Sequence, residues 1–196
     1  ENQGRTSCSY DRSEFLRELF RSNYQEAKIL EIGPFDNPFC IGQNVKYFEV
    51  MDADHLRQRS ALHGRSFHNV PKYIDYVSKD ADLSIVNDKF DIVFSSHVIE
   101  HQTNLIRHLQ IVEKLLNENG LYIMYVPDKR YCFDHFIDAT RPSEILGAYY
   151  DKKTLHPIQK VIEHVSMTTH NDPARHWLGD HGDGEIGRKR FLDAIS

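Results

Sequence analysis

The stretch "KILEIGPFDNPF" (residues 28–39) decides how this sequence folds. Apolar residues surround Glu31, as expected for a buried strand, and Gly33 then opens a loop. Pro34 and Phe35 stand where a nucleotide-binding turn carries further glycines, so the glycine triplet that admits a pyrophosphate is absent. The stretch therefore predicts a strand that leads into a ligand-binding loop, and it favours a nucleoside without phosphates over a dinucleotide.

The pattern that follows alternates strands with helices. We predict strands at 28–32, 45–50, 72–77, 89–98 and 121–127, and helices at 11–24, 52–64 and 103–120. Gly120 is expected to end the last of these helices, because glycine is common just past a helix C-terminus. The order predicts an α/β fold with a mostly parallel central sheet and helices on both faces. After Pro127 the pattern becomes loop-rich.

Composition narrows the classes of partner. A chain of 196 residues is long enough for a single domain with one core, and a net charge of −5 gives no basic surface for nucleic acid. The sequence has no apolar run approaching the roughly 18 residues of a membrane span. Its three cysteines (Cys8, Cys40 and Cys132) are odd in number and far apart, which argues against a disulfide framework. We therefore expect a cytoplasmic protein.

The two ends of the sequence suggest a larger protein. The first residue is Glu1 rather than Met, and Phe191, Leu192 and Ile195 have the spacing of a helix that has only started. We therefore expect a piece of a longer chain that continues beyond Ser196.

Acidic residues follow several of the predicted strands. Ligands of a doubly wound sheet bind at the carboxyl ends of its strands, and Glu49 ends the second strand sixteen residues after Gly33. That position suits a carboxylate that accepts hydrogen bonds from both ribose hydroxyls. Asp52 is an alternative for this role, unless it caps the next helix. Asp80 and Asp82 follow the third strand, either at a ligand or as turn residues.

Five segments in order carry a family resemblance. They are "LEIG" (30–33), the acid after the second strand, "DADL" (80–83), "FDIVFSSHVIEH" (90–101) and "LLNENGLYIMYVPD" (115–128). Over about residues 27–135 the chain resembles the class I S-adenosylmethionine-dependent methyltransferases. The resemblance implies a Rossmann-like methyltransferase fold and S-adenosylmethionine as cofactor, with S-adenosylhomocysteine as product. It divides the single domain 1–196 into a cofactor half, about 1–127, and an acceptor-binding region, about 128–190.

The resemblance also assigns cofactor roles to individual residues. It places the first motif around the methionine part, the strand-two acid at the ribose, the third motif at adenine, and the fourth near the sulfonium. The residues are, in that order, Glu31, Gly33, Pro34 and Phe35; Glu49; Asp80 with the Ala81 backbone; and Ser96 with His97. The family writes its first motif with three glycines, so we expect a different loop path here. From the residues alone, Glu31 could instead pair with a buried cation, and His97 could be a packed histidine.

The second part of the chain resembles a narrower subgroup. "VPDKRYCFD" (126–134) and "HVSMTTHNDPARHWLGDHGD" (164–183) are similar to methyltransferases encoded with, or fused to, glycosyltransferases of surface-polysaccharide synthesis. The similarity implies a sugar hydroxyl as acceptor and a covalent link to glycosyltransferase domains. The acceptor-binding residues expected from it are Asp128, Arg130, Tyr131 and Trp177. Family members end with two further edge strands, which this sequence lacks.

Histidines are concentrated near the end of the sequence. They are His156, His164, His170, His176 and His181. Their spacing matches no compact ligand set, so no metal site is predicted. A general base is favoured, because an imidazole can take a proton from a sugar hydroxyl during transfer. We predict His176 or His181 for this role with Asp180 as its orienting partner, while an ordinary loop is the alternative.

The leading hypothesis is therefore an O-methyltransferase that acts on a sugar hydroxyl of a glycan or nucleotide-sugar. A second hypothesis keeps the cofactor and replaces the acceptor by a small metabolite, a lipid or a protein. A third is a non-catalytic binding module of a polysaccharide-making protein, supported by the altered first motif. A fourth, a metal-dependent hydrolase, depends only on the histidines.

Overall fold

The computed structural model describes residues 26–182 and 185–195. The predicted helix at 11–24 and Cys8 lie outside these residues. The described residues form two compact units: unit 1 contains 26–96 and 111–123, and unit 2 contains 97–110, 124–182 and 185–195.

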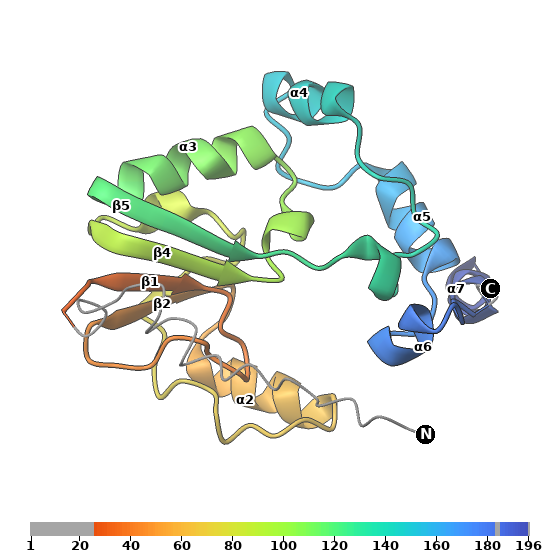
Figure 1. The fold of residues 1–196 in the computed structure, drawn as a ribbon, viewed down its shortest axis with the longest axis horizontal. Coiled ribbons are helices and arrows are strands. Elements are labelled where there is room, and N and C mark those ends of the chain that lie inside the picture. Colours follow the sequence, from red (N-terminus) through yellow and green to blue (C-terminus); the bar gives the residue numbers. More distant parts are fainter. Residues whose placement is uncertain (1–25, 183–184, 196) are drawn as a thin grey trace, which may run out of the picture. The chain divides into compact units, whose positions relative to one another are not determined.

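A five-stranded sheet forms the centre of the fold (Figure 1). Its strands are β1 (Ile29–Ile32), β2 (Val45–Glu49), β3 (Tyr76–Val77), β4 (Phe90–Ser96) and β5 (Leu116–Tyr125). They lie in the order β3-β2-β1-β4-β5, and β1 pairs in parallel with both β2 and β4. The arrows of β4 and β5 point the same way in Figure 1. The predicted α/β fold with a parallel sheet is confirmed, and the strand order reverses between β1 and β4, where such folds bind ligands.

The two central strands are buried on both faces. All four residues of β1 are buried, and Leu30 lies opposite Val93 of β4 with both side chains fully buried. Phe39, in the loop after β1, stacks on Phe94 of β4 with ring centroids 4.5 Å apart. Continuous burial of this kind is typical of parallel strands that helices cover on both sides.

Helices connect the strands and make up most of unit 2. The α-helices are α2 (Ala53–Leu62), α3 (Leu105–Leu115), α4 (Pro142–Tyr150), α5 (Ile158–Met167), α6 (Pro173–Trp177) and α7 (Glu185–Ile195). The described residues also form the short 3₁₀ helices η1 (Leu83–Ile85), η2 (Ile99–His101) and η3 (Lys129–Tyr131). In the described part of the chain, none of these helices has the length and apolar character that a membrane crossing requires.

The junction between α3 and β5 differs from the prediction. The helix ends at Leu115 and the strand begins at Leu116, well before the predicted start of the strand at residue 121. Gly120 is not a helix stop, and Asn119 is the residue with a positive φ, of 64°. A side chain at Gly120 would place its Cβ 3.0 Å from the Asn117 carbonyl oxygen. The glycine is therefore required by a close backbone approach rather than by a helix cap.

Candidate functional site

The loop after β1 is held in place by the carboxylate of Glu31. This side chain is only 2% exposed. Its Oε1 accepts a hydrogen bond from the Phe39 N–H at 2.7 Å, and its Oε2 accepts one from the Cys40 N–H at 2.8 Å. Both carboxylate oxygens of Glu31 thus bind backbone amides of the loop and fix its path.

Glu49 fixes the same loop from the end of β2. Its carboxylate is buried, with Oε1 accepting from the Phe35 N–H at 3.1 Å and Oε2 from its neighbour Val50 at 2.9 Å. Burial raises the pKa of Glu49, while the two backbone hydrogen bonds act in the opposite direction. Each carboxylate oxygen can accept a second hydrogen bond. Glu49 therefore retains acceptor capacity for the predicted ribose hydroxyls.

Two further side chains of the loop contact α2 and the segment after it. Asp36 is buried, and one of its carboxylate oxygens accepts a hydrogen bond from Ser60 Oγ at 3.2 Å. The guanidinium groups of Arg59 and Arg65 each lie 5.8 Å from the centroid of the Phe35 ring. Side-chain contacts therefore fix the conformation of this loop, which lacks the additional glycines of the family motif.

Strained backbone marks the predicted cofactor residues. Phe35, Ala81 and His97 have positive φ angles of 43°, 54° and 55°, and Gly33 has one of 72°. Residues other than glycine rarely adopt this conformation, and such positions are concentrated at functional sites. Each of the three follows a different strand of the sheet: β1, β3 or β4.

The acids after β2 and β3 have separate roles. Asp52 caps α2, because its carboxylate accepts a hydrogen bond from the His55 N–H at 2.9 Å. Asp82 caps η1 by accepting from the Ser84 N–H at 3.0 Å, and it is therefore a turn residue. Asp80, in contrast, is exposed.

Ser96 and His97 lie at the end of β4. Ser96 is the last residue of the strand and is partly exposed. The His97 N–H donates to the Tyr125 carbonyl at 3.0 Å, and its Nδ1 lies 3.6 Å from a Glu100 carboxylate oxygen. His97 is exposed, so the interpretation of a packed core histidine is wrong.

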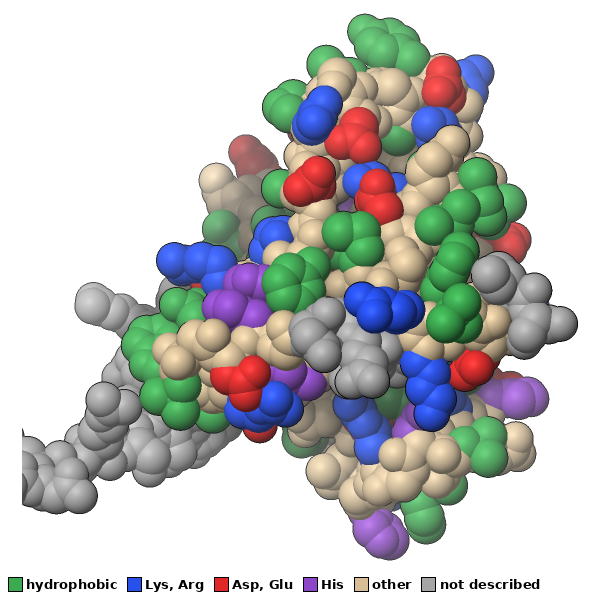
Figure 2. Space-filling model, turned by 90° about the vertical axis from the view of Figure 1, so that its right-hand side faces the viewer, with side chains coloured by type: hydrophobic (Ala, Val, Ile, Leu, Met, Phe, Trp, Pro, Cys, Tyr) green, Lys and Arg blue, Asp and Glu red, His purple; other side chains and the backbone are tan. Residues whose placement is uncertain are grey.

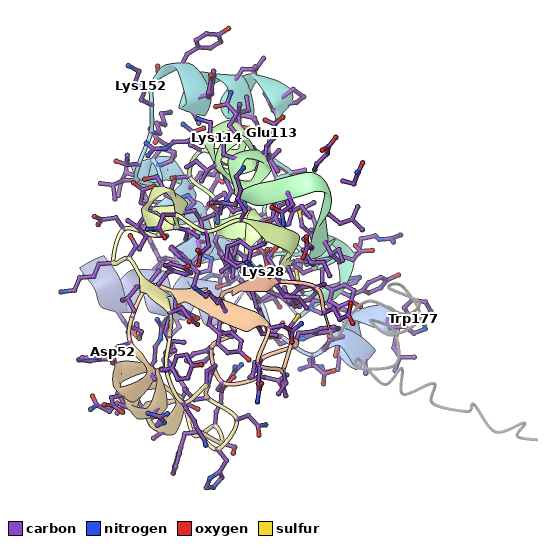
Figure 3. All side chains as sticks on the ribbon, turned by 90° about the vertical axis from the view of Figure 1, so that its left-hand side faces the viewer. Lys28, Asp52, Glu113, Lys114, Lys152 and Trp177 are labelled. Atoms are coloured by element: carbon purple, nitrogen blue, oxygen red, sulfur yellow. The ribbon has the colours of Figure 1, made fainter. Side chains whose placement is uncertain are left out.

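In unit 2, the predicted acceptor residues form an aromatic surface. The Tyr131 and Trp177 rings have centroids 5.2 Å apart, and Trp177 is 67% exposed. The Arg130 guanidinium lies 5.3 Å from the Tyr131 ring centroid and forms an ion pair with Asp128 at 2.6 Å. This ion pair lowers the pKa of Asp128 to about 2. Figure 3 shows Trp177 extending from α6.

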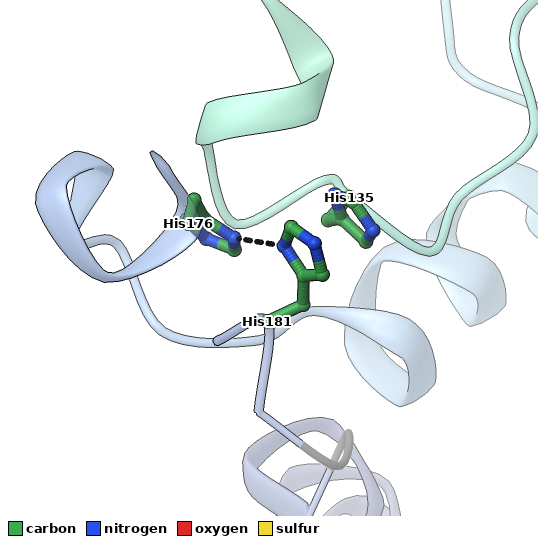
Figure 4. A group of neighbouring side chains, drawn as sticks. All are labelled: His135, His176 and His181. Atoms are coloured by element: carbon green, nitrogen blue, oxygen red, sulfur yellow. Dashed lines mark hydrogen bonds between the residues drawn. The ribbon is translucent and has the colours of Figure 1, made fainter. Parts of the chain in front are cut away.

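Unit 2 also contains a cluster of histidines (Figure 4). His176 of α6 is 2% exposed, and its Nδ1 lies 3.0 Å from His181 Nδ1. The other nitrogen of the His176 ring, Nε2, lies 3.0 Å from the His170 carbonyl oxygen. The two histidines predicted as candidate bases are therefore hydrogen-bonded to one another.

His135 also belongs to this cluster, although no role was predicted for it from the sequence. Its ring stacks on the His181 ring with centroids 3.7 Å apart, and its Nδ1 lies 3.1 Å from the Arg130 carbonyl oxygen. One ligand nitrogen from each of His135, His176 and His181 lies within 4.8 Å of the others. The local sequence "FDHF" (133–136) carries no ligand pattern, so only the fold reveals this residue.

Comparison with known proteins identifies the family. A profile of the methyltransferase domain matches residues 5–179, which is most of the chain. The chain belongs to the methyltransferase domain family. It is therefore an enzyme of the S-adenosylmethionine-dependent methyltransferase type, as predicted. A search of curated proteins found no match.

The structure corrects the role predicted for Asp180 in this methyltransferase. The Asp180 carboxylate accepts a hydrogen bond from Arg175 Nε at 2.8 Å and another from the Gly182 N–H at 3.1 Å. His176, rather than Asp180, is the side chain that orients His181. Burial and the neighbouring His135 and His176 lower the pKa of His181.

Two histidines of the methyltransferase's tail stand apart from the cluster. His156 Nε2 lies 3.2 Å from the His101 carbonyl oxygen, and His164 Nδ1 lies 4.0 Å from an Asp134 carboxylate oxygen. Both side chains are exposed. They serve as reference positions for experiments on the clustered histidines.

Proposed function

We propose that this methyltransferase transfers a methyl group from S-adenosylmethionine to a sugar hydroxyl of a glycan or nucleotide-sugar. The observation that supports a sugar is the exposed aromatic pair of Tyr131 and Trp177. An aromatic ring offers a flat apolar face, which matches the apolar face of a pyranose. Figure 2 shows hydrophobic side chains on the face that carries α6 and α7, and Trp177 is an exposed aromatic residue of α6.

Unit 1 supplies the cofactor residues in this proposal. The buried Glu49 carboxylate accepts hydrogen bonds from the ribose hydroxyls, and the exposed Asp80 accepts one from the adenine amino group. The loop that contains Gly33, Pro34 and Phe35 surrounds the methionine part of the cofactor, with Glu31 beneath it. Ala81 presents its backbone to the adenine ring. A charged carboxylate that receives two hydroxyl donors forms strong, short hydrogen bonds, so Glu49 contributes most to affinity.

Ser96 and His97 complete the cofactor site in the same proposal. They follow β4 and lie near the sulfonium, where the methyl group leaves. The exposed His97 side chain and the partly exposed Ser96 side chain are accessible for such a contact.

Unit 2 supplies the acceptor residues and the base. The sulfonium already provides the driving force for transfer, so the protein has to align the sulfur, the methyl carbon and the acceptor oxygen. The C–S bond breaks as the O–C bond forms, and the hydroxyl proton must pass to a base. We assign that base to His181, with Asp128 and Arg130 beside the aromatic pair as polar contacts to the sugar.

The hydrogen bonds around His181 support this assignment. A carbonyl oxygen only accepts, so His176 Nε2 carries the proton that it donates to His170. His176 Nδ1 must then accept a proton from His181 Nδ1, at 3.0 Å. This leaves the lone pair of His181 on Nε2, on a ring that is partly exposed, where it can receive the proton of a hydroxyl.

An acceptor screen tests the proposal. The protein is incubated with S-adenosylmethionine labelled in the methyl group and with nucleotide-sugars, oligosaccharides, lipids and peptides. We expect label in the sugars, as a stable methyl ether. Label only in a lipid, a peptide or a non-sugar metabolite would overturn the sugar assignment, and no binding of the demethylated cofactor would favour a non-catalytic module.

A matched pair of variants tests the aromatic surface. Trp177→Ala removes the ring, and we expect the KM for the sugar to rise several-fold, because a contact with an aromatic ring contributes on the order of 0.5–1.5 kcal/mol. Affinity for S-adenosylhomocysteine should not change. Leu178→Ala is the control, since Leu178 is adjacent and 79% exposed. Equal effects of the two variants would contradict a specific role for Trp177.

We also propose that the chain works in the cytoplasm beside glycosyltransferases, since both enzymes would use the same activated sugar or growing glycan. Co-purification of the native protein from its source tests this association. Recovery without glycosyltransferases would contradict it.

A further inference from the structure

The three clustered histidines come from separate segments of unit 2. His135 lies in the loop after η3, His176 in α6, and His181 in the loop before α7. Their ligand nitrogens lie within 4.8 Å of one another, and His176 is buried while the other two are partly buried. Imidazole nitrogens that converge in this way form the ligand set preferred by Zn²⁺ and related ions.

The hydrogen bonds around the cluster determine which ring nitrogens have a lone pair that can bind a metal ion. His135 Nδ1 lies 3.1 Å from the Arg130 carbonyl oxygen, and His176 Nε2 lies 3.0 Å from the His170 carbonyl oxygen. Because carbonyl oxygens accept only, these nitrogens carry the protons, and the lone pairs are on His135 Nε2 and His176 Nδ1. A ligand histidine in a metal site almost always donates its second nitrogen in this way.

The backbone around the cluster is held by Thr169. Its N–H donates to the Phe133 carbonyl at 3.0 Å, close to His135 in the chain, and its Oγ1 donates to the His181 carbonyl at 2.5 Å. Gly182, with φ of 68°, has no room for a side chain, because a Cβ would lie 2.6 Å from Thr169 Oγ1. One buried residue thus positions two of the three segments before any ligand arrives.

We propose that His135, His176 and His181 form a binding site for one Zn²⁺ ion. Zinc with three histidine ligands has Zn–N bonds of about 2.0–2.1 Å, which separate the nitrogens by about 3.3 Å in a tetrahedron. His176 and His181 are already close to this, with Nδ1 atoms 3.0 Å apart. In the metal-bound form the His181 ring carries its proton on Nε2 instead of Nδ1, so that Nδ1 becomes the ligand atom. His135 and His181 stack nearly parallel, at an angle of 11°, so one of these rings must turn for both lone pairs to meet the ion. The fourth position is left to water or to an oxygen ligand.

Metal titration tests this site without measuring methyl transfer. The protein is prepared without a polyhistidine tag, treated with chelator, and titrated with Zn²⁺ by calorimetry. We expect one ion per chain and a rise in thermal stability, since binding to the folded state stabilises it. Co²⁺ should give the visible absorption bands of a tetrahedral complex. Mg²⁺, which prefers oxygen ligands, should not compete.

Matched histidine variants locate the ion. His135→Gln and His181→Gln remove ligands whose side chains are only partly buried, and each should weaken Zn²⁺ binding at least tenfold. His156→Gln removes an exposed histidine of the same unit and should leave the affinity unchanged. Binding that is absent, exceeds one ion per chain, or weakens equally in all three variants would overturn the proposal. The readout is metal binding, so a failure here is distinguishable from a wrong acceptor assignment.

Discussion

The loop after β1 and the histidine cluster are built in opposite ways. In the loop, Glu31 binds the amides of Phe39 and Cys40, eight and nine residues further along the chain. In the cluster, His135 meets His181 across a much longer separation, through ring stacking and a shared threonine. The residues that hold the loop lie within a short stretch of sequence, whereas the residues of the histidine cluster do not. The comparison teaches that a local motif predicts a loop held by residues close to it in the chain, but not which side chains gather from distant segments.

The largest effect is expected at Glu31, where the loop depends on one buried carboxylate. Glu31→Ala leaves two buried amides without their acceptor, and each such loss costs about 1–3 kcal/mol. We expect the free energy of unfolding to fall by about 3 kcal/mol or more, measured by urea denaturation. Glu31→Gln, which keeps one acceptor oxygen, should cost less.

Glu113→Ala is the control for this experiment. Glu113 is an exposed carboxylate on α3, and removing it should change stability by less than about 0.5 kcal/mol. If Glu31→Ala were as mild as this control, the loop would not depend on its carboxylate, and the contrast with the cluster would disappear.

Much of the fold could be predicted from unit 1. The buried run of β1, the both-face burial of β4 and the cap at Asp52 each follow from residues close together in the chain. The start of β5 could not be predicted, because Asn117 and Gly120 are polar or turn-forming and join the strand only through the sheet partner. In unit 2 the segment between β5 and α5 lacks such periodicity, and α4 was missed since its apolar residues are flanked by irregular segments.

The next effect concerns cofactor affinity, and it separates two acids near the end of β2. Glu49→Ala should weaken binding of S-adenosylhomocysteine by roughly 1–3 kcal/mol, through lost charge-assisted hydrogen bonds to the ribose. Asp52→Ala should lower helix stability by about 1 kcal/mol, because it removes the α2 cap, and should leave cofactor affinity unchanged. Calorimetry of both variants measures this. Unchanged affinity in Glu49→Ala would remove the ribose assignment.

Some residues of the candidate site could be predicted from the sequence, and others could not. The resemblance assigned cofactor roles to Glu49, Phe35 and Ala81, and the structure shows that Glu49 is buried and that Phe35 and Ala81 have positive φ angles. His135 was not predicted, because metal-ligand spacing was sought along the histidine-rich tail while this residue lies outside it. The predicted pairing of Asp180 with a histidine also failed, since the nearby guanidinium of Arg175 is a stronger partner for a carboxylate than a neutral imidazole.

The smallest expected effect concerns His181, which has two proposed roles that exclude one another at any moment. A neutral imidazole has one lone pair, so His181 cannot hold Zn²⁺ and accept a substrate proton together. We expect saturating Zn²⁺ to slow methyl transfer several-fold, and chelator to restore it. In His135→Gln the ratio of rates with and without the ion should return toward one, because the site has lost a ligand, while His156→Gln should respond like the unaltered protein. Faster transfer with Zn²⁺ would instead mean that the ion, rather than His181, activates the acceptor hydroxyl. In that case the cluster would act as a metal centre, and His181 would not be the base.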